Sequence, residues 1–212
     1  KEAAMIDVLT WENSHLFGPA MVSQHRLRYR LFVERQGWDI PCFRGMEYDQ
    51  FDTPAAVYLL SRGERGEARG ITRLIPTTRP YMIKDLWSDF VEDSDLPVCP
   101  DIWEGTRFGV DQNLEPGLRN RIGRELVLAC LEFGLLTEIQ HFLVLMPVLI
   151  IRRIIGGAGC HYEWLGEPRN IGKHRVAVAR VTVSPQALHE ARRRFGDSSP
   201  VLNYVNPVME AA

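Results

Sequence analysis

Apolar residues recur along the chain with two alternating periods, and the order of these periods limits the fold more than any single motif. A period of two, typical of a strand, covers Met5 to Thr10, and a helical period follows over Ser14 to Arg35. In that helix Ser14 is the expected N-cap, Pro19 the expected start of the regular part, and Gly37 the stop.

The remaining segments continue the same alternation. Strands are expected at 55–61, 68–76, 102–110, 140–146, 162–165 and 174–183, and helices at 118–136, at 148–155 and from Ser184-Pro185 onward. Gly63 and Gly66 lie between two of these strands and favour a hairpin. The order predicts an α/β fold, a mixed sheet flanked by helices, in one domain over residues 5–212. Lys1 to Ala4 are expected to be a non-native leftover of cloning.

The composition excludes several classes. Lys and Arg total 25 against 27 Asp and Glu, which argues against a nucleic-acid binder. The longest apolar run, Phe142 to Ile151, is much shorter than the roughly 20 residues of a membrane span. We expect no signal peptide, because the first residues do not have a basic stretch followed by an apolar one. The four cysteines form no C-x-x-C pair, so we expect free thiols and a cytoplasmic protein.

Charged residues occupy positions where the periods call for apolar ones. Arg28 falls inside the apolar sector of the first helix when residues advance by about 100° each. Arg73 replaces an apolar residue on one face of its strand, and Glu104 does so on another. Arg107 lies on the opposite face from Glu104. Asp49 and Asp52 are three residues apart, close enough to converge on one turn.

These charges need partners if they are buried. One interpretation is that they pair with one another as a structural network, or that Arg28 merely reaches solvent at the edge of its helix face. The other is a polar pocket for a small zwitterion, in which arginines bind a carboxylate and carboxylates bind an ammonium group. Phe32, Trp38 and Phe108 would then face a cation or a flat base.

Familiar catalytic motifs are missing from the sequence. There is no G-x-S-x-G, H-E-x-x-H or Walker motif, and the six histidines show no metal-ligand spacing. Gly156 to Gly159 follows a helix and is read as a helix stop. We therefore expect no metal and no cofactor, and transfer by direct attack in a pocket.

One segment, Arg119 to Leu126, resembles a weakened phosphate cradle at a helix start. The N-acetyltransferases of the GCN5-related superfamily have a glycine-repeated form of this loop for the pyrophosphate of coenzyme A. Only Gly123 fits that pattern here, and Glu125 stands where a small residue is usual.

Six motifs can be read together: Arg28-x-x-x-Phe32, Gly37-Trp38, Glu47-x-Asp49-x-Phe51-Asp52, Gly70-x-x-Arg73, Pro76-Thr77-Thr78-x-Pro80-Tyr81-Met82 and Trp103-Glu104-x-Thr106-Arg107-Phe108. In order and spacing they resemble the LuxI-type acyl-homoserine-lactone synthases over about residues 5–110, and more loosely to about 195. The resemblance implies a GCN5-related acyltransferase fold. It also implies two substrates, S-adenosylmethionine (SAM) and an acyl thioester, and three products: an N-acyl-homoserine lactone, the freed carrier and methylthioadenosine.

The resemblance assigns roles to the charged positions. Glu104 is the expected general base, acting through a water on the SAM amine. Arg28 and Arg107 are expected to orient carboxylate or carbonyl groups. The remaining expected SAM-site residues are Asp49, Asp52 and Arg73 as a charge network, Phe32 and Trp38 as a wall, and Phe108.

The acyl pocket is expected along the strand ending near residue 146. The resemblance places there Leu143, Leu145, Met146, Pro147 and Val148, with Thr106 nearby. Family members that favour 3-oxo chains often have a Thr near this strand end, whereas this segment has no hydroxyl group. A buried 3-oxo group would lack a partner, so we predict a preference for acyl chains that lack the 3-oxo group, unless Thr106 supplies the bond.

Two basic patches bear on the acyl donor: Arg119, Arg121 and Arg124 with Gly123, and Arg152 with Arg153. They are either solvated helix faces or a surface that steers an acidic acyl carrier protein. The weakened cradle favours the carrier protein over acyl-CoA. Two other functions stay open: acylation of a different amine, and a non-catalytic acyl-ligand-binding module.

Overall fold

The computed structural model describes residues 5–92 and 96–204; the expectation for Lys1 to Ala4 lies outside these residues. Eleven strands are present among the described residues: β1 (Ile6–Leu9), β2 (Cys42–Phe43), β3 (Met46–Glu47), β4 (Val57–Arg62), β5 (Ala68–Pro76), β6 (Ile102–Val110), β7 (His141–Pro147), β8 (Tyr162–Trp164), β9 (Arg169–Ile171), β10 (His174–Thr182) and β11 (Leu202–Asn203). The α-helices are α1 (Gly18–Arg28), α2 (Met82–Leu86), α3 (Pro116–Leu136), α4 (Val148–Ile150) and α5 (Pro185–Phe195).

The chain divides into two compact units. Among the described residues the first comprises 5–73, 107–126 and 201–204, and the second comprises 74–92, 96–106 and 127–200. Strands β5 and β6 and helix α3 each contribute residues to both units. The chain therefore passes between the units inside regular elements.

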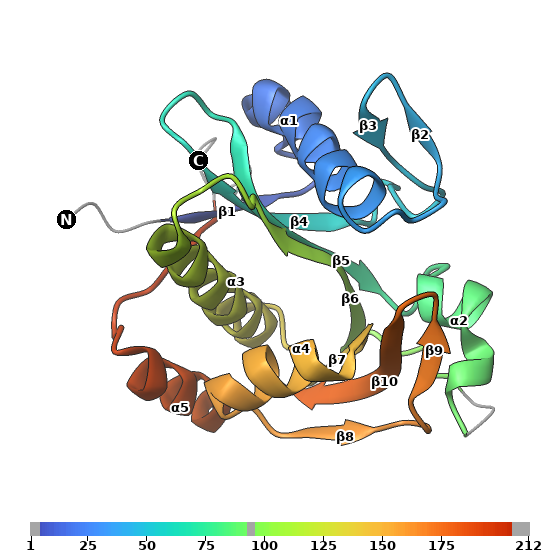
Figure 1. Cartoon of the computed structure of the whole chain (residues 1–212). Coiled ribbons are helices and arrows are strands. Elements are labelled where there is room, and N and C mark those ends of the chain that lie inside the picture. The colour runs from blue at the N-terminus through green and yellow to red at the C-terminus, as the bar shows by residue number, and fades with distance from the viewer. Residues whose placement is uncertain (1–4, 93–95, 205–212) are drawn as a thin grey trace. The chain divides into compact units, whose positions relative to one another are not determined.

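The strands form a mixed sheet (Figure 1). In the first unit the order is β11-β1-β4-β5-β6, with β1 parallel to β11 and antiparallel to β4. In the second unit the order is β5-β6-β7-β10-β8, and β9 also pairs with β10. Strand β7 is parallel to β6 and antiparallel to β10. The predicted mixed α/β sheet with helices is confirmed.

The first helix differs most from its prediction. It comprises a 3₁₀ turn at Ser14–Phe17, helix α1, and a π-helical segment at Tyr29–Glu34. Ser14 is not the N-cap: its hydroxyl donates to the Trp11 carbonyl oxygen. The predicted stop is confirmed, because Gly37 adopts a φ of 71°, which a residue with a Cβ adopts only at a cost.

Most other predicted elements appear within one or two residues of their expected bounds. Ser184 caps α5 by accepting a hydrogen bond from the Ala187 amide, and Pro185 begins that helix, as predicted. The predicted helix after β7 is short and continues as a π-helical segment, Ile151–Gly156. The sequence did not predict α2, β9, β11 or the β2–β3 hairpin. All four are short, so too few residues are present to show a helical or strand period.

Candidate active site

The charged residues singled out by periodicity meet in the first unit as a closed ring of alternating charge. Six ion pairs connect it in order: Arg28–Glu47, Glu47–Arg107, Arg107–Asp49, Asp49–Arg73, Arg73–Asp52 and Asp52–Arg28. The nitrogen–oxygen distances run from 2.5 to 3.0 Å. Three guanidinium groups and three carboxylates cancel, so the ring, which we call the ion ring, carries no net charge.

Four separate stretches of chain supply the ion ring. Arg28 ends α1, while Glu47 lies on β3 and the two aspartates follow that strand. Figure 1 shows the β2–β3 hairpin beside α1, in keeping with the ion pair between Arg28 and Glu47. Arg73 comes from β5 and Arg107 from β6. The side chains of Arg28, Arg73 and Glu47 are 0% exposed.

Arg107 reaches the ion ring because its strand is irregular. Its φ is +53°, in the left-handed region that is unfavourable for a side chain with a Cβ. Thr106 and Arg107, adjacent in sequence, are 5% and 8% exposed, so both side chains are buried at this irregular point of β6.

Asp52 has its acceptor capacity filled inside the protein. It accepts two hydrogen bonds from Arg28 and one each from Arg73, the Tyr58 hydroxyl and the Asp49 amide, at 2.6 to 2.8 Å. A carboxylate offers about four lone-pair sites. Burial acts to raise the pKa of Asp52, but the hydrogen bonds and charges of Arg28 and Arg73 outweigh it and lower that pKa far below its usual range. Asp52 is therefore ionised and fully engaged.

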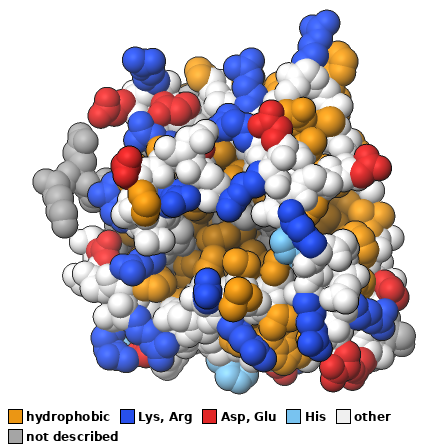
Figure 2. Space-filling view, viewed as in Figure 1, with side chains coloured by type: hydrophobic (Ala, Val, Ile, Leu, Met, Phe, Trp, Pro, Cys, Tyr) orange, Lys and Arg blue, Asp and Glu red, His pale blue; other side chains and the backbone are white. Residues whose placement is uncertain are grey.

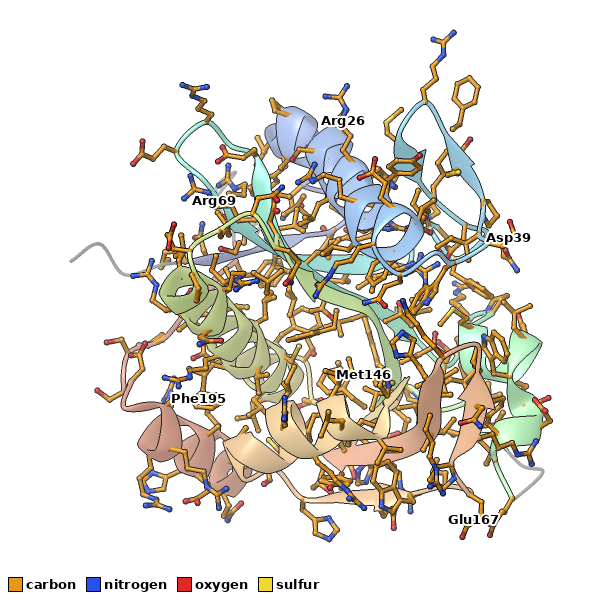
Figure 3. All side chains as sticks on the ribbon, in the orientation of Figure 1. Arg26, Asp39, Arg69, Met146, Glu167 and Phe195 are labelled. Atoms are coloured by element: carbon orange, nitrogen blue, oxygen red, sulfur yellow. The ribbon has the colours of Figure 1, made fainter. Side chains whose placement is uncertain are left out.

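The arginines are stabilised in the same way. Burial acts to lower the pKa of Arg28, and Asp52 and Glu47 more than reverse it. Arg26, two positions earlier on α1, points instead to solvent (Figure 3). The ion ring thus matches the interpretation in which the buried charges pair with one another.

His25 and Gln24 border the ion ring from α1. The Nδ1 of His25 lies 2.8 Å from the backbone carbonyl oxygen of Glu47. This contact links α1 to β3 at Glu47, the residue that pairs with both Arg28 and Arg107. Burial and the charge of Arg28 lower the pKa of His25. The Oε1 of Gln24 lies 3.5 Å from Arg28.

An aromatic pair covers one arginine of the ion ring. The rings of Phe32 and Trp38 stack with centroids 5.1 Å apart, and the Arg107 guanidinium lies 5.6 Å from the Phe32 centroid. Phe32 belongs to the π-helical segment, a feature often found at functional sites. Phe108, next to Arg107, is half-buried.

Glu104 belongs to the second unit and is 0% exposed. Its carboxylate oxygens accept hydrogen bonds from the backbone amides of Met82 and Ile83, at 2.9 and 2.6 Å. Both amides lie in the first turn of α2. The prediction of a charge on a buried face is confirmed, while its role as a base stays a prediction.

The predicted acyl-pocket residues form a continuous stretch in the second unit. Leu143 is buried on β7, whereas Leu145, Met146, Pro147 and Val148 are half-buried where β7 passes into α4. Met146 lies at this junction (Figure 3). All five side chains are apolar, which suits contact with an acyl chain.

The segment Arg119 to Leu126 lies within α3 and does not form a loop before it. The Arg119 amide already donates to the Glu115 carbonyl oxygen within the helix. The amides without a helical partner therefore precede Arg119, and the predicted cradle around Gly123 does not have them. The side chain of Arg119 bonds Gln112, and Arg121 pairs with Glu125. The segment is therefore an ordinary helix with a basic surface.

Arg152 and Arg153 are exposed on the π-helical segment after α4. Over the region of α4 and α5, Figure 2 shows basic side chains among hydrophobic ones. Here the structure provides a basic surface in the second unit.

Two members of the site received no role from the sequence. Glu47 bridges Arg28 and Arg107, and Tyr58 donates to Asp52. Glu47 stands in the motif Glu47-x-Asp49-x-Phe51-Asp52, but its segment has no visible period that predicts its burial, and Tyr58 has the pattern of an ordinary strand residue.

Within residues 5–92 and 96–204, no group of three or more His, Cys, Asp or Glu side chains is arranged to hold a metal ion. In the same part of the chain no helix is long and apolar enough to span a membrane.

Comparison with known proteins identifies the family. A family model for autoinducer synthases matches residues 16–191. An acyl-homoserine-lactone synthase of Vibrio anguillarum is 40% identical over 92 residues, 43% of this chain and 48% of that protein, so the match spans about half of its length. One of Pseudomonas aeruginosa is 29% identical over 76% of this chain and 81% of its own.

Solved structures agree. A CoA-dependent acyl-homoserine lactone synthase, BjaI, with SAM and isopentyl-CoA, has a TM-score of 0.88 at 28% identity over 96% of this chain and 94% of its own. An N-acetyltransferase of Lactobacillus plantarum at 13% identity and a TM-score of 0.55 shares the fold alone.

The chain belongs to the autoinducer synthase family and has the fold of the GCN5-related N-acetyltransferases. It is an acyltransferase, an acyl-homoserine-lactone synthase that makes a quorum-sensing signal from SAM and an acyl thioester.

Proposed function

We propose that the ion ring is the scaffold of the SAM site and that Glu104 serves the acyl transfer. The SAM amine loses a proton, attacks the thioester carbonyl carbon and expels the donor thiol, which takes up a proton. The SAM carboxylate then attacks its own γ-carbon, and methylthioadenosine departs as a neutral thioether. This second step needs no protein acid, because the leaving sulfonium sulfur becomes neutral as the bond breaks.

The observation that carries the proposal is the position of Arg107, which belongs to the ion ring and also lies against the stacked rings of Phe32 and Trp38. Arg107 is 8% exposed, is held by Glu47 and Asp49, and faces the Phe32 ring. We assign it the SAM carboxylate, with Phe32, Trp38 and Phe108 as the wall of the site. Arg28, Arg73, Asp49 and Asp52 act through the ion ring, since the hydrogen bonds given above tie them to one another.

Glu104 is the proposed general base, through a water. It is buried and accepts hydrogen bonds from two backbone amides, which stabilise the charge of its carboxylate. The acyl chain is assigned to Leu143, Leu145, Met146, Pro147 and Val148, with Thr106 beside Glu104 on β6.

For the acyl donor, the similarity to a CoA-dependent synthase supports acyl-CoA. The exposed Arg152 and Arg153 support the acyl carrier protein that the sequence analysis favours. We propose acyl-CoA as a donor and the carrier protein as the second candidate. The four free cysteines favour a reducing, cytoplasmic setting.

The test supplies SAM with an unsubstituted acyl-CoA, or with the matching acyl carrier protein, and follows lactone and methylthioadenosine by mass spectrometry. The expected result is equimolar release of both products. Acylation of another amine without methylthioadenosine would contradict the assignment. The donor with the higher kcat/KM is the preferred one.

The role of Glu104 is tested by Glu104→Gln, which should slow acylation roughly a hundredfold. Glu167→Gln, an exposed glutamate of the same unit, is the matched control and should leave turnover unchanged. Full activity of Glu104→Gln would remove Glu104 from the reaction.

A further inference from the structure

Glu104 accepts hydrogen bonds from the main chain of α2 at both of its carboxylate oxygens. The Met82 amide donates to Oε2 at 2.9 Å and the Ile83 amide to Oε1 at 2.6 Å. Glu104 lies on β6 and both donors lie on α2, so the contact joins two elements. Because each oxygen has its own donor, rotation of the carboxylate would break both bonds.

These amides are available because α2 has no cap of its own. The first amides of a helix have no partner within it. Tyr81 occupies the N-cap position, with φ −137° and ψ 154°, and makes no side-chain cap hydrogen bond. Glu104 therefore takes the place of a capping side chain from a distant part of the sequence.

The turn that carries these amides is fixed in place. The Tyr81 hydroxyl donates to the Pro97 carbonyl oxygen at 2.9 Å, and the Trp87 and Phe90 rings pack edge to face behind α2. A Cβ built on Gly166 would lie 2.3 Å from the Phe90 carbonyl oxygen, so the backbones approach closely there. Met82 and Ile83 thus belong to a supported turn.

We infer that the Met82 and Ile83 amides are positioning groups for the acyl transfer: they hold the Glu104 carboxylate in one orientation toward the substrate amine. The inference rests on the catalytic role proposed for Glu104. It adds a main-chain contribution from α2 to the positioning of that carboxylate.

Ionisable groups on neighbouring elements lie near Glu104 in its unit. Tyr81 faces it from the start of α2, and burial together with the charge of Glu104 raises the pKa of that phenol. Asp85 lies one turn further on α2. On β7 the register partner is Leu143, and Arg180 follows on β10, where it pairs with Glu163.

Met82→Pro isolates the device. Proline lacks the amide, and it is favoured as the first helical residue. The residue before proline prefers a φ near −120° and a ψ of roughly 120° to 160°, which Tyr81 already adopts. Met82→Ala is the matched control, because it shortens the same side chain and keeps the amide.

The readout is the pH profile of kcat. Loss of one hydrogen-bond donor destabilises the ionised form of Glu104. The fall of kcat at low pH, the acid limb of the profile, should therefore lie about one pH unit higher in Met82→Pro than in Met82→Ala, a tenfold change in proton affinity. The KM for SAM should be the same in both. A purely structural fault would lower kcat at every pH without moving the limb.

An unmoved limb in folded Met82→Pro would overturn the inference. If circular dichroism shows that this variant is unfolded, Glu104→Asp takes its place. Its carboxylate is one methylene short of the amides, and an upward shift of about half a pH unit is expected, because the pKa of an unperturbed aspartate is about 0.4 below that of a glutamate; an acid limb that does not rise would overturn the inference. Full activity of Glu104→Gln would instead refute the proposed base, so the two failures are distinguishable.

Discussion

Arg28 and Arg30 are two residues apart and have opposite surroundings. The Arg28 side chain is 0% exposed and belongs to the ion ring, whereas Arg30 is 40% exposed and pairs with Asp111 at 2.7 Å. The same residue type therefore serves as a buried structural ion at one position and a surface ion at the other.

The pair gives a direct stability test. Arg28→Ala should lower the free energy of unfolding by about 3–5 kcal/mol, because it leaves Glu47 and Asp52 buried without their partner. Arg30→Ala should cost less than about 1 kcal/mol. Urea denaturation followed by circular dichroism measures both. Equal losses would mean that the ion ring does not stabilise the first unit.

His25 predicts how stability depends on pH. Its pKa is lowered in the folded protein, first by burial and then by Arg28. The unfolded chain therefore takes up a proton more readily, and stability falls as the pH drops through the unfolded value of about 6.5.

His25→Asn removes the titration and retains a donor near the Glu47 carbonyl oxygen. Its free energy of unfolding should fall less than that of the wild type between about pH 7.5 and 5.5, measured by urea denaturation. His141 also has a lowered pKa and contributes equally to both proteins, so the difference isolates His25. Parallel curves would contradict the assignment.

The elements that the sequence predicted are those in which the apolar period continues over many residues. The elements that it did not predict are short and depend on contacts with distant parts of the chain. Strands β5 and β6 match the expected bounds, and α3 begins two residues early. Helix α2 has five residues and is capped by Glu104 from β6, so nothing local announces it. The site followed the same rule: periodicity revealed Arg28, Arg73 and Glu104 as misplaced charges, but not that Glu47 would pair two arginines.

The packing of α3 on β5 in the first unit requires a residue without a side chain. A Cβ on Gly70 would lie 2.5 Å from Ile122 and 3.2 Å from Leu126. Gly123, on the same stretch of α3, has nothing within 4 Å of its Cβ position. Gly70 is therefore required for the packing of α3 on β5, whereas Gly123 only lowers the stability of α3.

Gly70→Ala should accordingly destabilise the protein by about 1–3 kcal/mol through overpacking. Gly123→Ala should stabilise it by about 0.5–1 kcal/mol, since alanine favours the helix. Thermal unfolding of the two variants beside the wild type measures the difference. Destabilisation by Gly123→Ala would indicate that this position needs glycine for another reason, such as the approach of a ligand.

At the scale of the whole molecule, the chemistry of the β7–α4 junction sets the substrate. Leu145, Met146, Pro147 and Val148 offer no hydroxyl group to a 3-oxo chain. An unpaired buried carbonyl costs about 1–3 kcal/mol, so kcat/KM should be about tenfold or more higher for the unsubstituted acyl donor.

Val148→Thr supplies a hydroxyl in nearly the same volume and should narrow that preference about tenfold. The measurement is kcat/KM for matched donors of one chain length, with Met146→Leu as a control that adds no polar group. A faster wild-type reaction with the 3-oxo donor would contradict the prediction and point to Thr106 as the hydrogen-bond partner.

The ion ring also bears on the order in which the chain is made. Its carboxylates have been synthesised by residue 52, but Arg107 follows 55 positions later. Until β6 is synthesised, Glu47 and Asp49 lack one of the cations that let them leave water, so the ion ring cannot close. Nascent chains halted shortly before residue 107 should be digested readily by protease, and those halted well beyond it should resist.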